Sequence, residues 1–132
     1  MKLGFTGTRE GMSQHQKEQF ALKILELNPI EFHHGDCEGA DAQAHDIVRM
    51  FLPDTKIVIH PPESDYMRAY KVGDETREPL GYLPRDRNIV NETEYMFGAP
   101  LVDDQNANSG TWYTIRYSWS VKRPGTVLPR NQ

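Results

Sequence analysis

The chain has 132 residues, with 19 acidic side chains against 15 Lys and Arg, and its net charge is −4. This length suits one domain around a single core, and the charge argues against a duplex-binding protein, whose surface needs a basic stripe. Cys37 is the sole cysteine and no apolar run reaches 18 residues, which argues against disulfides, a cysteine zinc cluster and a transmembrane helix. The glycine-rich first residues differ from a signal peptide, so we expect a soluble, cytoplasmic protein without a membrane partner.

The first 60 residues alternate between short apolar runs and segments whose apolar residues recur at helical spacing. In chain order they predict a strand at 2–8, a helix at 14–28, a strand at 30–34, a helix at 40–51 and a strand at 56–60. Ser13 is a suitable N-cap for the first helix, and Pro29 and Pro53 stop the two helices.

The second half of the chain begins with a stretch, 63–84, that has no sustained period and contains two prolines, two glycines and three tyrosines. Such a long irregular stretch in a small domain is typical of a lid or an interface loop. The remaining pattern predicts a short helix at 86–93, a strand at 94–102, a helix at 111–123 and a strand at 126–129.

This alternation predicts an α/β fold in one domain, 1–132, with a mostly parallel sheet of about five strands. Parallel neighbours need crossover connections, and the crossover helices cover both faces of the sheet. Ligands of such sheets bind outside the carboxyl ends of the strands. The turns that follow the strands are therefore the candidate sites.

Three turns between a strand and a helix are rich in glycine and polar residues, namely 6–11, 35–41 and 108–111. Glycine lets the backbone approach a ligand, free amides at a helix start bind anions, and an arginine such as Arg9 pairs with phosphate. Each turn alone is more often structural, and Arg9 also fits a solvated charge beside Glu10. Three such turns at one end of the expected sheet favour a phosphate-binding site.

The segments GFTGTREG, HHGDCEGADAQAHDIV, HPP, RNIVNETEYMFGAP and NSGTWYTIRYSWSVKRP follow the order of motifs in the SLOG superfamily. From about Lys2 to Pro129 the chain resembles the YspA/YpsA-like branch, whose relatives include the LOG phosphoribohydrolases and the DNA-processing DprA proteins. The resemblance implies a Rossmann-like three-layer sandwich that binds nucleotides or nucleotide-derived molecules at the strand ends.

The resemblance also implies ligand contacts in the three turns and on the helix before the fourth strand. By position these contacts are Gly7, Thr8, Arg9, Gly35, Gly39, Ala40, Asp41, Arg87, Asn88, Ser109, Gly110 and Thr111. LOG enzymes share a GGxGTxxE pattern whose last glutamate is catalytic, and Thr114 stands at that position here. From the residues alone, Arg87 equally fits an ion pair with Asp86 or Glu92 on its own helix.

These residues favour the binding of a nucleotide or an ADP-ribose-like molecule by a sensor or sequestering protein, with Asp36 and Asp41 near the ribose. The alternative is hydrolysis of the N-glycosidic bond of nucleoside 5′-monophosphates. A hydrolase needs a carboxylate, which Asp36, Glu38 or Asp41 would have to supply. The same three acids also fit plain capping of a helix start. Single-strand nucleic-acid binding, which the negative charge disfavours, and a plain interaction module are further options.

Several other residues have a structural interpretation beside a chemical one. Asp41 and His45 lie one helical turn apart, a spacing that metals use, but no third ligand accompanies them, and we expect neither a metal site nor a resident cofactor. His33 and His34 are neighbours on a strand, which predicts one packed and one exposed ring. Cys37 precedes a helix, where the pKa of a thiol is lowered, but it has no evident base beside it.

The last predicted helix carries more aromatic side chains than one buried stripe requires. They are Trp112, Tyr113, Tyr117 and Trp119. Core packing accounts for part of this surface, and we expect the rest to be buried between subunits of a homo-oligomer, as relatives in the superfamily commonly associate.

Overall fold

The computed structural model describes residues 1–131 and contains, within them, six strands and four helices. In chain order these are β1 (Lys2–Gly7), α1 (Gln14–Leu27), β2 (Glu31–His34), α2 (Ala40–Phe51), β3 (Lys56–Ile59), β4 (Glu75–Thr76), α3 (Tyr82–Glu92), β5 (Tyr95–Ala99), α4 (Gly110–Ser120) and β6 (Gly125–Val127). None of the helices in this part of the chain has the length and apolar character needed to cross a membrane.

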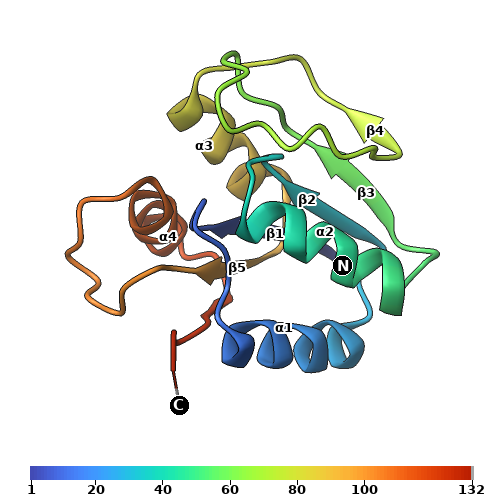
Figure 1. Ribbon diagram of the computed structural model, residues 1–132, viewed down its shortest axis with the longest axis horizontal. Helices are drawn as coiled ribbons and strands as arrows, with labels where there is room; N and C mark the ends of the chain where they lie inside the picture. The colour runs from blue at the N-terminus through green and yellow to red at the C-terminus, as the bar shows by residue number, and fades with distance from the viewer. Residues whose placement is uncertain (132) are drawn as a thin grey trace.

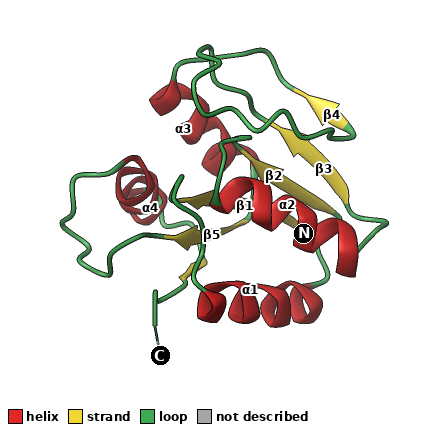
Figure 2. Ribbon diagram, viewed as in Figure 1, coloured by secondary structure: helices red, strands yellow, loops and turns green. Residues whose placement is uncertain are grey.

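The six strands form one sheet in the order β4-β3-β2-β1-β5-β6, and all neighbours are parallel. Helices α1 and α2 cover one face, and α3 and α4 cover the other (Figure 1; Figure 2). The chain runs outward from β1 through β2 and β3, then returns to the other side of β1 at β5, so the strand order switches there. The predicted Rossmann-like sandwich is confirmed, with six strands in place of about five.

Four buried phenylalanine rings join the sheet to α1, namely Phe5, Phe20, Phe32 and Phe97. The Phe20 ring stands edge-on to those of Phe5 and Phe97, with centroids 5.3 and 5.2 Å away. Burial of each ring contributes roughly 1.5–3 kcal/mol. On the opposite face, a Cβ at Gly98 would lie 2.5 Å from an isoleucine side chain of α4, so this glycine lets the helix approach the sheet.

Three helices begin within one residue of their predicted starts, but α3 begins earlier, at Tyr82. Pro84 lies in the first turn of α3, where its missing N–H removes no hydrogen bond. This proline was predicted to belong to the irregular stretch, which is why the start of α3 was predicted too late. Ser13 caps α1 as predicted, and Gln16 completes a capping box with it.

The irregular stretch 63–84 packs along β3 and supplies the edge strand of the sheet, β4. Its short strand β4 pairs with β3, and Leu80 forms a bridge with Pro62. The two-residue β4 was not predicted because it is too short to show a period. Of the predicted lid or interface loop, Tyr82 and Leu83 line the cavity described below.

The adjacent residues His33 and His34 of β2 are both buried, so the prediction of one exposed ring is wrong. Each ring lies against a second histidine. His33 Nδ1 is 2.8 Å from His60 Nε2, and His34 Nε2 is 2.9 Å from His45 Nδ1. The sequence gives no sign of these pairs because their partners lie on other segments of the chain.

Candidate functional site

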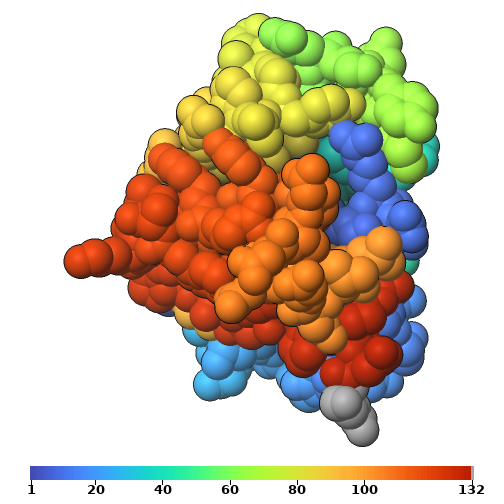
Figure 3. All heavy atoms as spheres, turned by 90° about the vertical axis from the view of Figure 1, so that its left-hand side faces the viewer, coloured from blue at the N-terminus to red at the C-terminus, as the bar shows by residue number. Residues whose placement is uncertain are grey.

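A cavity of about 530 Å³ opens beside the carboxyl ends of β1 and β5, near the switch in strand order. The three glycine-rich turns, the first turn of α3 and the loop before α4 contribute its wall. Figure 3 shows this side of the molecule, where the blue residues after β1, the yellow α3 and the orange loop come together. The volume is typical of small-molecule sites, which span roughly 300–1,000 Å³.

The turn after β1 places Gly7, Thr8 and Arg9 in the cavity wall. The carbonyl of Thr8 accepts the amide N–H of Ala40, which opens α2. The Arg9 guanidinium lies over the Tyr82 ring, 4.7 Å from its centroid. This contact with the ring face does not use the N–H groups of the guanidinium, which stay available to an anion.

The turn after β2 holds the first turn in place. Gly39 has φ +85°, and a Cβ there would lie 2.1 Å from the carbonyl oxygen of Arg9. Only glycine therefore allows the two turns to pack at this distance. Gly35 lines the cavity, whereas Gly39 and Ala40 position the turns without contributing to the lining.

The three acidic candidates of this turn have different surroundings. Asp36 is fully buried, pairs with Arg68 at 3.0 Å and accepts the amide N–H of Lys71 at 2.9 Å. Glu38 is exposed to solvent. Asp41 alone among the three lines the cavity within the described residues 1–131. Asp36 and Glu38 are therefore not placed to contact a ligand there.

Asp41 has hydrogen-bonding capacity that the protein does not use. Its Oδ2 accepts the amide N–H of Cys37 at 3.2 Å, while its buried Oδ1 has no hydrogen-bond partner in the described chain. Burial raises the pKa of Asp41 to about 7, although the nearby Arg85 charge lowers it. An unpartnered oxygen at a cavity wall is a site for a ligand hydroxyl, and a carboxyl with a pKa near neutrality is suited to proton transfer.

Two neighbouring residues that were not predicted as site residues, Arg85 and Asp86, also line the cavity. Arg85 Nε lies 2.6 Å from Asp86 Oδ1, and Arg85 Nη1 donates to the Gly35 carbonyl at 2.6 Å. The Thr114 hydroxyl donates to Asp86 Oδ2 at 3.1 Å. Burial raises the pKa of Asp86 despite the Arg85 charge. Thr114, at the position of the expected catalytic glutamate, thus contacts a carboxylate supplied by α3.

Arg87 and Asn88, which the resemblance selected, lie outside the cavity lining. Arg87 is exposed and donates to the Tyr113 hydroxyl at 3.0 Å. Residues two apart on a helix differ by about 200° of rotation, so Arg87 points away from the cavity that Arg85 faces. The resemblance selected Arg87 by its position in the motif, whereas the packing of α3 brings Arg85 to the cavity.

The turn before α4 supplies an open helix N-terminus. The Ser109 hydroxyl accepts the amide N–H of Trp112 at 3.1 Å, and Ser109, Gly110 and Thr111 line the cavity. The first N–H groups of a helix have no intrahelical partner and lie at the positive end of its dipole. A Cβ at Gly110 would meet no atom within 4 Å, so a ligand has access to this backbone.

Apolar side chains form another part of the cavity wall. They are Phe5, Leu83, Leu101, Val102 and Trp112. The Trp112 indole N–H donates to the Val102 carbonyl at 2.8 Å, which fixes the orientation of the ring. The cavity thus combines an apolar wall with a few polar groups, as sites for organic ligands usually do.

Cys37 lies at the cavity as an inert thiol. Burial raises its pKa, and the neighbouring Asp41 carboxylate raises it further. The interpretation of a lowered thiol pKa at the start of a helix is therefore wrong, because desolvation outweighs the helix dipole here.

Residues that could hold a metal lie outside the cavity lining. One ligand atom each of His33, His60 and Glu92 lies within 4.8 Å of the others. Burial lowers the pKa of His33 and lowers that of His60 to about 3, so both rings are neutral, as metal binding requires. Asp41 and His45 do not share a site, because His45 bonds a buried histidine of β2.

The aromatic side chains of α4 are divided between packing and solvent. Trp112 is buried against Trp119, with ring centroids 6.0 Å apart, and Trp119 is 47% exposed. The hydroxyls of Tyr113 and Tyr117 bond to α3, the latter to Asn91 at 2.9 Å. Contacts within the chain thus account for much of this surface, and homo-oligomer formation stays a prediction.

Comparison with known proteins identifies the fold. The chain is similar to the molybdenum cofactor binding protein of the phototrophic bacterium Rippkaea orientalis, with a TM-score of 0.71 and 14% identity over 96% of this chain and 76% of that one. It is also similar to the structural genomics target TM1055, with a TM-score of 0.64 and 12% identity over 95% and 72% of the two chains. No protein-family model matches the sequence, and no curated protein is significantly similar to it. At these identities the likeness extends to the fold alone.

Proposed function

We propose that this chain binds a nucleotide or a nucleotide-derived molecule, as a sensor or sequestering protein of the YspA/YpsA-like SLOG branch. The observation that carries the proposal is the cavity itself, in which an arginine with unused donors, an open helix N-terminus and an apolar wall meet. The arginine and the helix N-terminus correspond to the phosphate of a nucleotide, and the apolar wall corresponds to its base.

The phosphate contacts are the backbone N–H groups of Gly110 and Thr111 together with Arg9. The helix start offers donors and a positive dipole end, which together bind phosphate without a side chain. Arg9 adds a bidentate donor and is preoriented on the Tyr82 ring. Arg85 is less available, because Asp86 and backbone carbonyls already use its donors.

The apolar wall accommodates a planar ring, and Asp41 Oδ1 accepts a hydrogen bond from a ribose hydroxyl. A bound hydroxyl would satisfy the one oxygen of this carboxyl that has no partner in the described chain. The similar protein of Rippkaea orientalis binds the molybdenum cofactor. This cofactor therefore belongs in the ligand panel beside the nucleotides.

The second candidate function is hydrolysis of an N-glycosidic bond in nucleoside 5′-monophosphates. It is favoured by the Asp41 carboxyl, whose pKa of about 7 lets it exchange a proton near neutral pH. Asp86, which bonds Thr114, provides a second carboxyl in the same cavity. Release of free base by the wild type but not by Asp41→Asn or Asp86→Asn would identify the enzyme, with Glu38→Gln as the control outside the cavity.

The test of binding is ultrafiltration of the purified protein with nucleoside monophosphates, ADP-ribose, NAD-derived nucleotides and the molybdenum cofactor, followed by mass spectrometry of both fractions. We expect a phosphate-bearing compound to be retained intact. A charge-assisted hydrogen bond contributes about 1.5–3 kcal/mol, so Arg9→Ala should weaken binding roughly tenfold to a hundredfold. Arg87→Ala is the matched control and should bind as the wild type does. Retention of no phosphate compound, or equal losses in both variants, would contradict the proposal.

We also propose that the chain forms a homo-oligomer through the outer face of α4. Trp119 is large and half exposed beside the buried Trp112, as expected for a side chain that a second subunit covers. Light scattering should give a mass above that of one chain for the wild type and the monomer mass for Trp119→Glu. A monomeric wild type would refute this part of the proposal.

A further inference from the structure

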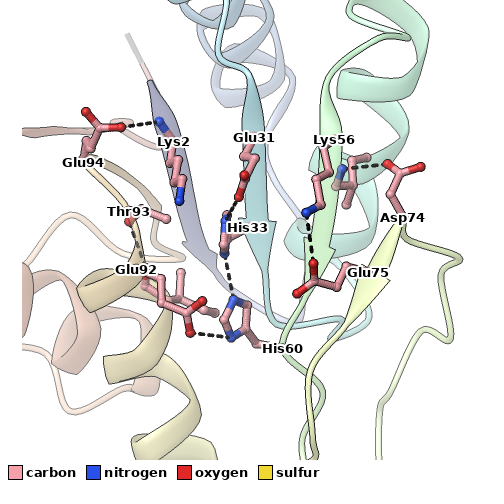
Figure 4. A network of polar contacts seen from close by, with 12 residues as sticks. Lys2, Glu31, His33, Lys56, His60, Asp74, Glu75, Glu92, Thr93 and Glu94 are labelled. Atoms are coloured by element: carbon pink, nitrogen blue, oxygen red, sulfur yellow. Dashed lines mark hydrogen bonds and ion pairs between the residues drawn. The ribbon is translucent and has the colours of Figure 1, made fainter.

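The face of the sheet beside α3 carries a chain of polar contacts that the proposed function does not use (Figure 4). It runs from Glu31 through His33 and His60 to Glu92, across β2, the end of β3 and the end of α3. We propose that His33, His60 and Glu92 bind one divalent transition metal ion, Zn²⁺ in the first place, at a site separate from the cavity.

The three side chains are brought together by different elements of the fold. His33 lies on β2, His60 follows β3 directly, and Glu92 is the last residue of α3. His33 and His60 are 1% and 2% exposed, so their rings are fixed by packing. Glu92 is about one-third exposed, which leaves its carboxylate able to move and leaves the site open to an entering ion.

Two contacts of this network are hydrogen bonds, and the third is open. Glu31 Oε1 lies 2.9 Å from His33 Nε2, and His33 Nδ1 lies 2.8 Å from His60 Nε2. His60 Nδ1 and Glu92 Oε2 lie 4.0 Å apart, too far for a hydrogen bond. Two neutral histidines supply the two hydrogens that the first two contacts need, which leaves His60 Nδ1 facing the Glu92 carboxylate with no hydrogen between them. One ligand atom of each of His33, His60 and Glu92 lies within 4.8 Å of the other two, so a small rearrangement brings all three to one metal ion.

The donor set selects the kind of ion. Two imidazoles and one carboxylate suit zinc, which keeps its fourth position for water in such three-ligand sites. Bonds of about 2.0–2.2 Å place tetrahedral donors roughly 3.3–3.6 Å apart, so the three donors, which lie within 4.8 Å of one another, must rearrange slightly and Glu92 must move inward. Glu31 is already placed to accept the outer N–H of His33, as carboxylates do for metal-bound histidines.

Arg77 opposes the ion in the metal-free protein. Its Nη2 lies 2.7 Å from Glu92 Oε1, and it also pairs with Glu75. Removal of this cation frees the Glu92 carboxylate and lowers the local positive charge. Arg77→Gln should therefore bind the metal more tightly than the wild type, a result that a purely structural network would not produce.

The experiment is calorimetric titration of the chelator-treated, full-length protein with Zn²⁺, repeated with Co²⁺ to record its visible spectrum. We expect one ion per chain and the intense bands of four-coordinate Co²⁺. His33→Gln and His60→Gln should weaken Zn²⁺ binding at least about a hundredfold, and Glu31→Gln roughly tenfold to a hundredfold. His45→Gln, from the histidine pair without carboxylates, is the matched control and should bind as the wild type does.

Absence of saturable Zn²⁺ binding to the wild type would overturn the proposal, as would equal losses in His33→Gln and His45→Gln. Should the buried histidine variants unfold, Glu92→Gln and Arg77→Gln decide the question, because both residues are about one-third exposed. We expect weaker binding in the first and tighter binding in the second, and unchanged affinity in both would refute the site. Arg9→Ala should retain Zn²⁺ binding, which separates this result from the fate of the proposed nucleotide site.

Discussion

The turn after β2 and the start of α2 carry two buried carboxylates, Asp36 and Asp41, which differ in their hydrogen-bond partners. On the side that faces the stretch 63–84, Asp36 gives both oxygens to partners, Arg68 and the Lys71 amide. On the side that faces the cavity, Asp41 leaves one buried oxygen without a partner in the described chain. Asp36 is therefore a structural residue whose contacts the protein itself provides, whereas Asp41 has an oxygen left to bind a ligand.

The arginines on the two sides repeat this contrast. Arg68 is paired with the fully buried Asp36 at 3.0 Å. Arg9 lies on the face of the Tyr82 ring, and its N–H groups remain available at the cavity wall. Substitutions at Asp36 and Arg68 should therefore lower the stability of the protein. Those at Asp41 and Arg9 should change ligand binding, and at Asp41 also the pH dependence of stability.

The largest effect is expected from Asp36→Asn. Removal of one partner from a buried ion pair costs about 3 kcal/mol or more, because the other charge loses its compensation. Asn accepts the left-handed backbone of this position, φ +58°, so the loss will report the ion pair itself. Urea denaturation at neutral pH measures it. Asp41→Asn is the matched substitution, and an equal loss of stability there would break the contrast between the two sides.

A second prediction concerns the pH dependence of stability. Burial raises the pKa of Asp41 from 3.8 to about 7, so between these values the folded chain holds a proton that the unfolded chain has released. The contribution of Asp41 to stability is therefore complete below pH 3.8 and is lost as the pH rises to 7, by up to about 1.4 kcal/mol per pH unit. Asn at this position does not titrate.

The measurement for this prediction is urea denaturation of the wild type and Asp41→Asn at a series of pH values from 4 to 8. The stability of the variant relative to the wild type should rise through this range and level off above pH 7. A difference in the free energy of unfolding that stays constant with pH would mean that the pKa of Asp41 is not raised by burial, and Asp41 would then not differ from an ordinary carboxylate.

The sequence was sufficient for the architecture because hydrophobic period and helix caps are local signals. The helix at 40–51 was predicted with its observed bounds, and Ser13 was identified as a cap. The failures have local causes as well. The two-residue β4 has no period, and Pro84 inside the first turn of α3 has the same sequence signature as a loop.

Prediction of the candidate site was less complete because it depends on direction and on distant contacts. The glycine-rich turns and Asp41 lie at the cavity, but Arg87, which was selected by its position in the motif, is exposed, and Arg85 lines the cavity instead. The burial of Asp36 depends on Arg68, more than thirty residues away in the sequence. The spacing of residues along the chain carries no information about such a contact.

The smallest expected effect distinguishes the starts of two helices. Helix α2 has an acidic residue, Asp41, in its first turn, whereas α4 has none. A carboxylate at an uncompensated helix start contributes about 0.3–1 kcal/mol, so Gly110→Asp should stabilise the protein by this amount, and no atom obstructs the new side chain.

Because the carboxylate takes the place that we assign to phosphate, the same variant should lose the ligand retained by the wild type. Gly110→Asn, without the charge, is the control and should lose less affinity. A Gly110→Asp protein that is more stable and still binds the ligand would move the phosphate away from α4 and leave Arg9 as its principal contact.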